Sequence, residues 1–125
     1  MQNLIWVALG GIVGAVSRYL IGEYTARHFN ASFPVATLFI NFAGSFIIAF
    51  FLIWTSERVL ADPRWRLLVA VGFCGAFTTF SSYAFETFKL FEQKAVGLMF
   101  LNIAANNLAA LAAVVVGVVL ARRVA

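Results

Sequence analysis

The chain has 125 residues, of which 63% are hydrophobic and only 11% are charged, and its formal charge at pH 7 is +4. Soluble domains have roughly 25% charged residues, so this composition predicts an integral membrane protein. The basic residues form no patch with interleaved aromatic rings, so no nucleic-acid partner is expected. The single cysteine, Cys74, excludes an intrachain disulfide. No catalytic residue set or phosphate loop can be assembled, so we do not expect an enzyme.

Four apolar stretches, at about residues 4–22, 33–55, 67–91 and 95–121, are close to or above the ~20 residues that a helix needs to cross a bilayer. The connections are short, so we expect a single all-α membrane domain over residues 1–125. No Lys or Arg precedes the first stretch, which we interpret as a retained helix rather than a signal peptide. Gly10 and Gly14 in that helix have a spacing typical of close helix packing. His28 is expected to lie in a loop.

Positive charge is nearly balanced between the two sides that these four helices define. The termini and the connection at residues 56–66 would share one side, with Arg58, Arg64, Arg66, Arg122 and Arg123. The other side would have Arg18, Arg27, Lys89 and Lys94. Because an excess of cations on one side sets orientation, we infer that the chain can insert both ways up. An antiparallel homodimer would then be possible. A single orientation set by helix order is the open alternative.

Polar side chains at membrane depth are the functional candidates, because they are costly unless paired. They are Thr37, Asn41 and Ser45 in the second stretch, Thr78, Thr79, Ser81, Ser82 and Glu86 in the third, and Asn102, Asn106 and Asn107 in the fourth. Any one of them could bond its own helix or join two helices. Together, neutral donors with a single carboxylate favour a path for an anion over a path for a cation.

The third stretch contains the segment GFCGAFTTFSSYAFE at residues 72–86, where glycines and hydroxyls interrupt an apolar run. A helix break there would free backbone carbonyls, which can replace the hydration shell of a hard monovalent cation. Phe80 and Tyr83 are three residues apart and share a helix face. The electropositive edges of such rings can favour a small anion, although simple packing is the alternative.

This segment, together with TLFINFAG at residues 37–44 and the late Arg18 in the first span, resembles the Fluc/CrcB fluoride channels over essentially the whole chain. The resemblance implies an antiparallel, dual-topology homodimer in the cell (inner) membrane, with a broken third span. It also implies two pores that export cytoplasmic fluoride passively, and a structural sodium ion at the dimer interface.

The resemblance further implies roles for individual residues. Asn41 matches the amide donor that lines the pore, and Phe80 and Tyr83 match an aromatic box in which the second position is commonly Phe. The other pore positions are Ser81, Ser82, Thr37, Asn102, Asn106 and Glu86, with Arg18 at the vestibule. The backbone carbonyls of Gly75 and Thr78 match the sodium ligands.

Two other classes stay open at this point. Proton-coupled small multidrug transporters are similar in size and topology, but they need a carboxylate in the middle of the first span, and residues 4–22 contain none. A membrane subunit with no transport activity would instead use its buried asparagines and serines only to hold helices together.

Overall fold

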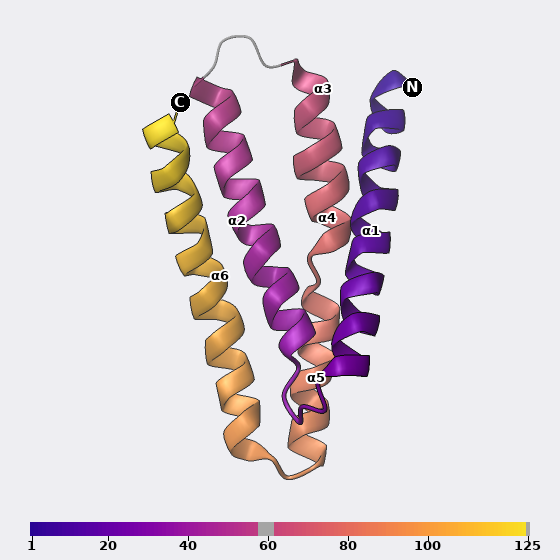
Figure 1. Cartoon of the computed structure of the whole chain (residues 1–125), viewed down its shortest axis with the longest axis vertical. Coiled ribbons are helices and arrows are strands. Elements are labelled where there is room, and N and C mark those ends of the chain that lie inside the picture. Colours follow the sequence, from indigo (N-terminus) through magenta and orange to yellow (C-terminus); the bar gives the residue numbers. More distant parts are fainter. Residues whose placement is uncertain (58–61, 125) are drawn as a thin grey trace.

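The computed structural model describes residues 1–57 and 62–124, which form a bundle of long helices (Figure 1). The elements are α1 (Gln2–His28), α2 (Val35–Glu57), α3 (Pro63–Arg66), η1 (Leu67–Cys74), α4 (Gly75–Phe77), α5 (Phe80–Glu92) and α6 (Val96–Val124). Elements α3 to α5 follow one another as a single long segment. This segment and the three long helices are each long and apolar enough to cross a membrane. The expectation of an all-α protein with four membrane-spanning helices is confirmed.

Both termini lie at one end of the bundle, together with the end of α2 and the start of α3 (Figure 1). At this end Arg122 forms an ion pair with Glu57, with 3.8 Å between Nε and Oε1. The side chain of Asp62 accepts the N–H of Arg64 at 2.9 Å and so caps α3, whose first residue is Pro63. Arg58, one of the cations expected here, lies outside the described residues.

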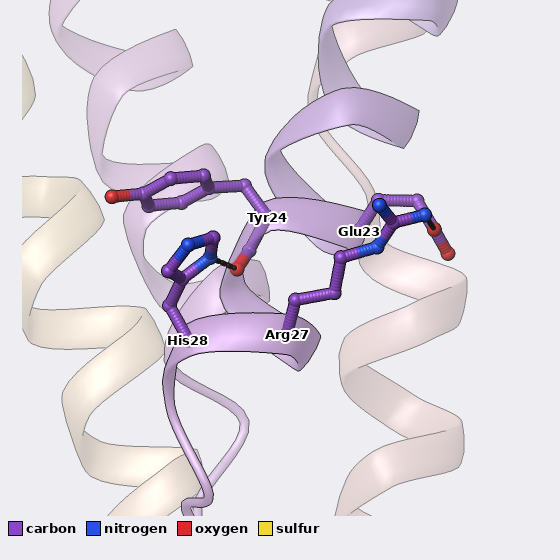
Figure 2. A network of polar contacts seen from close by, with 4 residues as sticks. All are labelled: Glu23, Tyr24, Arg27 and His28. Atoms are coloured by element: carbon purple, nitrogen blue, oxygen red, sulfur yellow. Dashed lines mark hydrogen bonds and ion pairs between the residues drawn. The ribbon is translucent and has the colours of Figure 1, made fainter.

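The opposite end of the bundle includes the last turn of α1, which continues beyond residue 22 to His28. The expectation that His28 lies in a loop is therefore wrong. Its Nδ1 atom lies 2.9 Å from the carbonyl oxygen of Tyr24, and the two rings stack with centroids 4.2 Å apart (Figure 2). Arg27 forms an ion pair with Glu23 at 3.0 Å. Basic residues in the last turn complement the helix dipole, which favours this longer helix.

Close backbone contacts between α1 and η1 hold the first and third spans together. A Cβ atom at Gly72 would lie 2.6 Å from the carbonyl oxygen of Val7, and one at Gly10 would overlap the carbonyl of Leu68. A Cβ atom at Gly14 would likewise overlap the carbonyl of Phe73. Because lipid tails are as apolar as these helices, small residues that let backbones approach are a main source of association. The packing role predicted for Gly10 and Gly14 is confirmed.

Helical geometry is interrupted within the third segment at Thr78 and Thr79. Thr78 has φ −74° and ψ 155°, and Thr79 has φ −149° and ψ 115°, so both residues are extended. The interruption is visible between α4 and α5 (Figure 1). It falls near the middle of the segment Pro63–Glu92 and therefore at membrane depth. Backbone groups at this point need partners from elsewhere in the protein.

Candidate functional site

The extended residue Thr79 is held by a side chain from α2. Oδ1 of Asn41 accepts the backbone N–H of Thr79 at 2.8 Å, and Nδ2 of the same amide donates to the Thr79 carbonyl oxygen at 3.1 Å. One asparagine therefore satisfies both polar groups of a residue that cannot join the helical pattern. An unpaired backbone group at membrane depth costs several kcal/mol, so this pairing stabilises the interruption.

Hydroxyl groups gather at the start of α5, around Thr79. The Thr79 side chain accepts the N–H of Ser82 at 3.2 Å, which is the usual hydrogen bond of an N-cap threonine. Its Oγ1 also lies 3.0 Å from Oγ of Ser82 and 3.3 Å from Oγ of Ser81. Thr78 instead donates to the carbonyl oxygen of Cys74 at 2.9 Å. The two serines and Thr79 thus form one small hydroxyl cluster.

Two backbone carbonyls lose their usual helical donors at the interruption. In a continuous α-helix the N–H of Thr79 would donate to Gly75, and the N–H of Ser82 would donate to Thr78. Both N–H groups are taken by side chains instead, namely Asn41 Oδ1 and Thr79 Oγ1. The carbonyls of Gly75 and Thr78 are the two that the sequence resemblance assigns as metal ligands.

A central cavity of about 450 Å³ lies beside the interruption. Its lining includes Gly75, Thr78, Thr79, Asn41, Asn106 and Asn107, together with the rings of Phe80 and Tyr83. These two rings meet edge to face, with centroids 5.3 Å apart and an angle of 63° between their planes. Nδ2 of Asn107 lies 3.3 Å from the Tyr83 hydroxyl oxygen, to which it donates. The hydroxyl proton of Tyr83 is not used by this hydrogen bond.

Three asparagines and a threonine form a continuous chain of hydrogen bonds that starts at the lining of the central cavity. Asn41 donates to Asn106 at 3.1 Å, Asn106 donates to Asn102 at 2.8 Å, and Asn102 donates to Thr87 at 2.9 Å. Asn102 and Asn106 are 0% and 5% exposed. Thr87 is not among the residues expected from the sequence, because only the α5–α6 hairpin brings it opposite Asn102.

A second cavity, here called the end cavity, also has a volume of about 450 Å³ and lies toward the His28 end of α1. Its lining includes Arg18, Thr37, Ser82 and Glu86, and it shares Thr79 with the central cavity. The Thr37 hydroxyl donates to Oε1 of Glu86 at 2.7 Å. The other carboxylate oxygen, Oε2, is buried and has no hydrogen-bond partner among the described residues. Both cavities therefore border the interrupted backbone at Thr79.

The structure brings together most of the residues that the sequence selected. Asn41, Phe80, Tyr83, Asn106, Gly75 and Thr78 line the central cavity, and Thr37, Ser82, Glu86 and Arg18 line the end cavity. Ser81 and Asn102 line neither of these two cavities. Ser81 contacts Thr79, and Asn102 lies behind Asn106. Both are thus neighbours of cavity-lining residues.

Comparison with known proteins gives a consistent result. The family described as "CrcB-like protein, Camphor Resistance (CrcB)" matches residues 5–118. The "Fluoride-specific ion channel FluC" of Koribacter versatilis (strain Ellin345) is 54% identical over 114 residues, which cover 91% of this chain and 90% of the relative. The protein of the same name from Sulfurihydrogenibium sp. (strain YO3AOP1) is 43% identical over 122 residues, covering 98% of each chain. The chain belongs to the CrcB-like family of multi-pass membrane proteins.

Proposed function

We propose that this protein is a fluoride-selective channel that lets cytoplasmic fluoride leave the cell passively across the inner membrane. The observation that carries the proposal is that the central and end cavities both border Thr79, in a region lined mainly by neutral hydroxyl and amide groups at membrane depth. Relatives that are 43% to 54% identical over most of the chain are named fluoride-specific ion channels, which supports the same function.

The chemistry of the lining suits a small anion. Hydroxyl groups can replace part of the water shell of fluoride without the trapping effect of a fixed positive charge. Tyr83 and Ser82 offer hydroxyl donors along the two cavities, and Arg18 supplies a cation at the end cavity. Both N–H groups of Asn41 already donate, one to Thr79 and one to Asn106. An ion that binds Asn41 would therefore compete with the hydrogen bonds that hold the interruption.

The residues at the interruption fit the structural sodium ion that the family implies. The carbonyls of Gly75 and Thr78 have lost their helical donors, and both residues line the central cavity. Carbonyl oxygens are the ligands by which channels replace the hydration shell of a monovalent cation. These two carbonyls, with their equivalents in a second copy, would hold the ion. The bound ion would supply a fixed positive charge that attracts the carbonyls at the interruption in each copy.

An antiparallel homodimer explains the polar surface that one copy leaves uncovered. Gly75, Ser81 and Asn107 are exposed near the middle of their segments, and the ring of Phe80 is 77% exposed. Lipid is a poor neighbour for such groups, whereas a second copy could cover them. The near balance of cations between the two ends supports insertion in both orientations. Two-fold symmetry would then give two equivalent pores in each dimer.

The test is fluoride release from liposomes that contain the purified protein. Vesicles are loaded with potassium fluoride, valinomycin carries the counter-charge, and a fluoride electrode records efflux. We expect fluoride release well above that of protein-free vesicles, and little chloride release from vesicles loaded with potassium chloride. Fluoride efflux no faster than in protein-free vesicles would overturn the proposal.

A pair of phenylalanine variants makes this test specific to the site. Phe80→Leu removes a ring of the central cavity and should greatly reduce fluoride efflux. Phe91→Leu, which changes a ring that is 58% exposed at the far end of α5, is the matched control and should conduct like the wild type. Equal loss in both variants would mean that the central cavity is not on the path. Cross-linking of the two variants, compared with wild type, is the control for assembly, and both should still form dimers.

A further inference from the structure

Thr87 on α5 anchors one end of the buried chain of hydrogen bonds. Its hydroxyl donates to the carbonyl oxygen of Tyr83 at 2.7 Å, and a carbonyl can only accept. The single hydroxyl proton is thereby used, and the Thr87 oxygen accepts from Nδ2 of Asn102 at 2.9 Å. The Asn102 amide must therefore present its nitrogen to Thr87 and its oxygen to the opposite side.

The other end of the chain imposes the same polarity. The backbone N–H of Thr79 is a donor, so the Asn41 atom 2.8 Å from it must be oxygen. The Asn41 nitrogen then faces Asn106, whose nearest atom, 3.1 Å away, must also be oxygen. Finally, the Asn106 nitrogen lies 2.8 Å from Oδ1 of Asn102 and 3.2 Å from its backbone carbonyl. If any one of these amides were rotated by 180°, a donor would face a donor and an acceptor would face an acceptor.

We propose that Thr87 is a positioning residue for the interruption: its hydroxyl holds the Asn102 amide in place and, through Asn106, the position of the Asn41 amide against Thr79. Thr87 is not part of the lining of the central or the end cavity, so it acts through other residues. The consequence for ion flow rests on the proposed function. The position of the Asn41 amide does not rest on it, and that position can be measured separately.

Because these asparagines are buried, their hydrogen bonds depend strongly on Thr87. Asn102 is 0% exposed and Asn106 is 5% exposed, so water cannot readily replace a missing partner. Valine has nearly the shape of threonine but no hydroxyl. In Thr87→Val the Asn102 nitrogen loses its acceptor and is left with a buried, unpaired N–H, and a half-turn of the amide would not help because it would set nitrogen against nitrogen at Asn106. The Asn102 amide, no longer held by Thr87, shifts from its present position, and the shift passes through its hydrogen bond with Asn106 to Asn41.

The test measures the side-chain amide of Asn41 by NMR of ¹⁵N-asparagine-labelled protein in detergent, with the resonance identified by its absence in Asn41→Gln. Thr87→Val should shift this resonance, while Thr87→Ser, which keeps the hydroxyl, should not. The matched control is Thr55→Val, because Thr55 is 6% exposed and its hydroxyl donates at 2.7 Å to its own helix, at the Phe51 carbonyl. An unchanged Asn41 resonance in Thr87→Val, or an equal shift in Thr55→Val, would overturn the proposal.

The functional arm uses the fluoride efflux assay on the same variants. Loss of the anchoring hydrogen bond should reduce efflux about tenfold in Thr87→Val, whereas Thr87→Ser and Thr55→Val should stay within about twofold of wild type. Wild-type efflux in Thr87→Val, or an equal loss in Thr87→Ser, would count against a positioning role. If Thr87→Val does not fold, Thr87→Cys replaces it, and an unshifted Asn41 resonance in that variant contradicts the proposal. A wild type without fluoride efflux refutes the proposed function, and the resonance alone then decides the role of Thr87.

Discussion

The side-chain amide of Asn41 and the backbone of Thr79 form a reciprocal pair of hydrogen bonds. The pattern is the one that joins two residues on neighbouring β-strands. The Thr79 N–H lies 2.8 Å from Oδ1 of Asn41, and the Thr79 carbonyl oxygen lies 3.1 Å from Nδ2. The interruption between α4 and α5 is therefore held from α2. Its geometry depends on packing between spans rather than on its own segment alone.

Replacing Asn41 by alanine should destabilise the folded protein by about 3 kcal/mol, because two backbone groups of Thr79 lose their partners at membrane depth. Unfolding followed by tryptophan fluorescence in detergent measures the loss. Asn30→Ala, at an exposed residue outside the helices, is the control and should change stability little. Similar stability for both variants would show that the pairing contributes nothing.

The contact between α1 and η1 predicts opposite effects at two adjacent glycines. Gly10→Ala should destabilise the protein by about 1–3 kcal/mol, because the new methyl group would overlap the Leu68 carbonyl. Gly11→Ala meets no atom within 4 Å, so the higher helix propensity of alanine should leave stability unchanged or slightly raised. Thermal unfolding of the two variants, compared with wild type, tests this. Equal effects would contradict the observed packing of α1.

The Tyr83 hydroxyl should matter for selectivity more than for folding. Its oxygen accepts from Asn107 at 3.3 Å, which leaves its proton to donate into the central cavity. Tyr83→Phe keeps the ring and removes this donor, so we expect the ratio of fluoride to chloride efflux to fall by about tenfold, the effect of one lost hydrogen bond. Tyr24→Phe, whose ring stacks on His28 at the end of α1, is the matched control (Figure 2). An unchanged ratio in Tyr83→Phe would remove the hydroxyl from the selectivity argument.

The balance of cations predicts that orientation can be biased by few substitutions. Removing Arg27 and Lys94 together, as Arg27→Gln and Lys94→Gln, leaves two cations on their side against five on the other. The positive-inside rule then predicts one orientation, with the termini in the cytoplasm. Reporter fusions at the C-terminus should report both locations for wild type and one for the double variant. The reverse pair, Arg122→Gln and Arg123→Gln, should not give that bias. A single location for wild type would argue against dual topology.

Local features of the sequence were sufficient to predict four membrane-spanning helices. Apolar stretches of spanning length and few charges determine that outcome, because the bilayer accepts only helices or closed barrels. The same features were insufficient at the end of α1. His28 was expected in a loop, yet the helix continues through it, because the stacking on Tyr24 and the ion pair of Arg27 extend a helix whose apolar run has already ended.

The candidate residues could also be selected from sequence, since polar side chains at membrane depth are rare. Their partners could not. Asn41 meets Thr79 and Asn106, which are 38 and 65 residues away along the chain, and Thr87 meets Asn102 only across a hairpin. Composition and spacing along the chain determine which groups must find partners in the membrane. Only the packing of the spans decides which partners they find. A hydrogen bond requires the two atoms to be placed to within a few tenths of an ångström, and the local sequence pattern does not specify such positions.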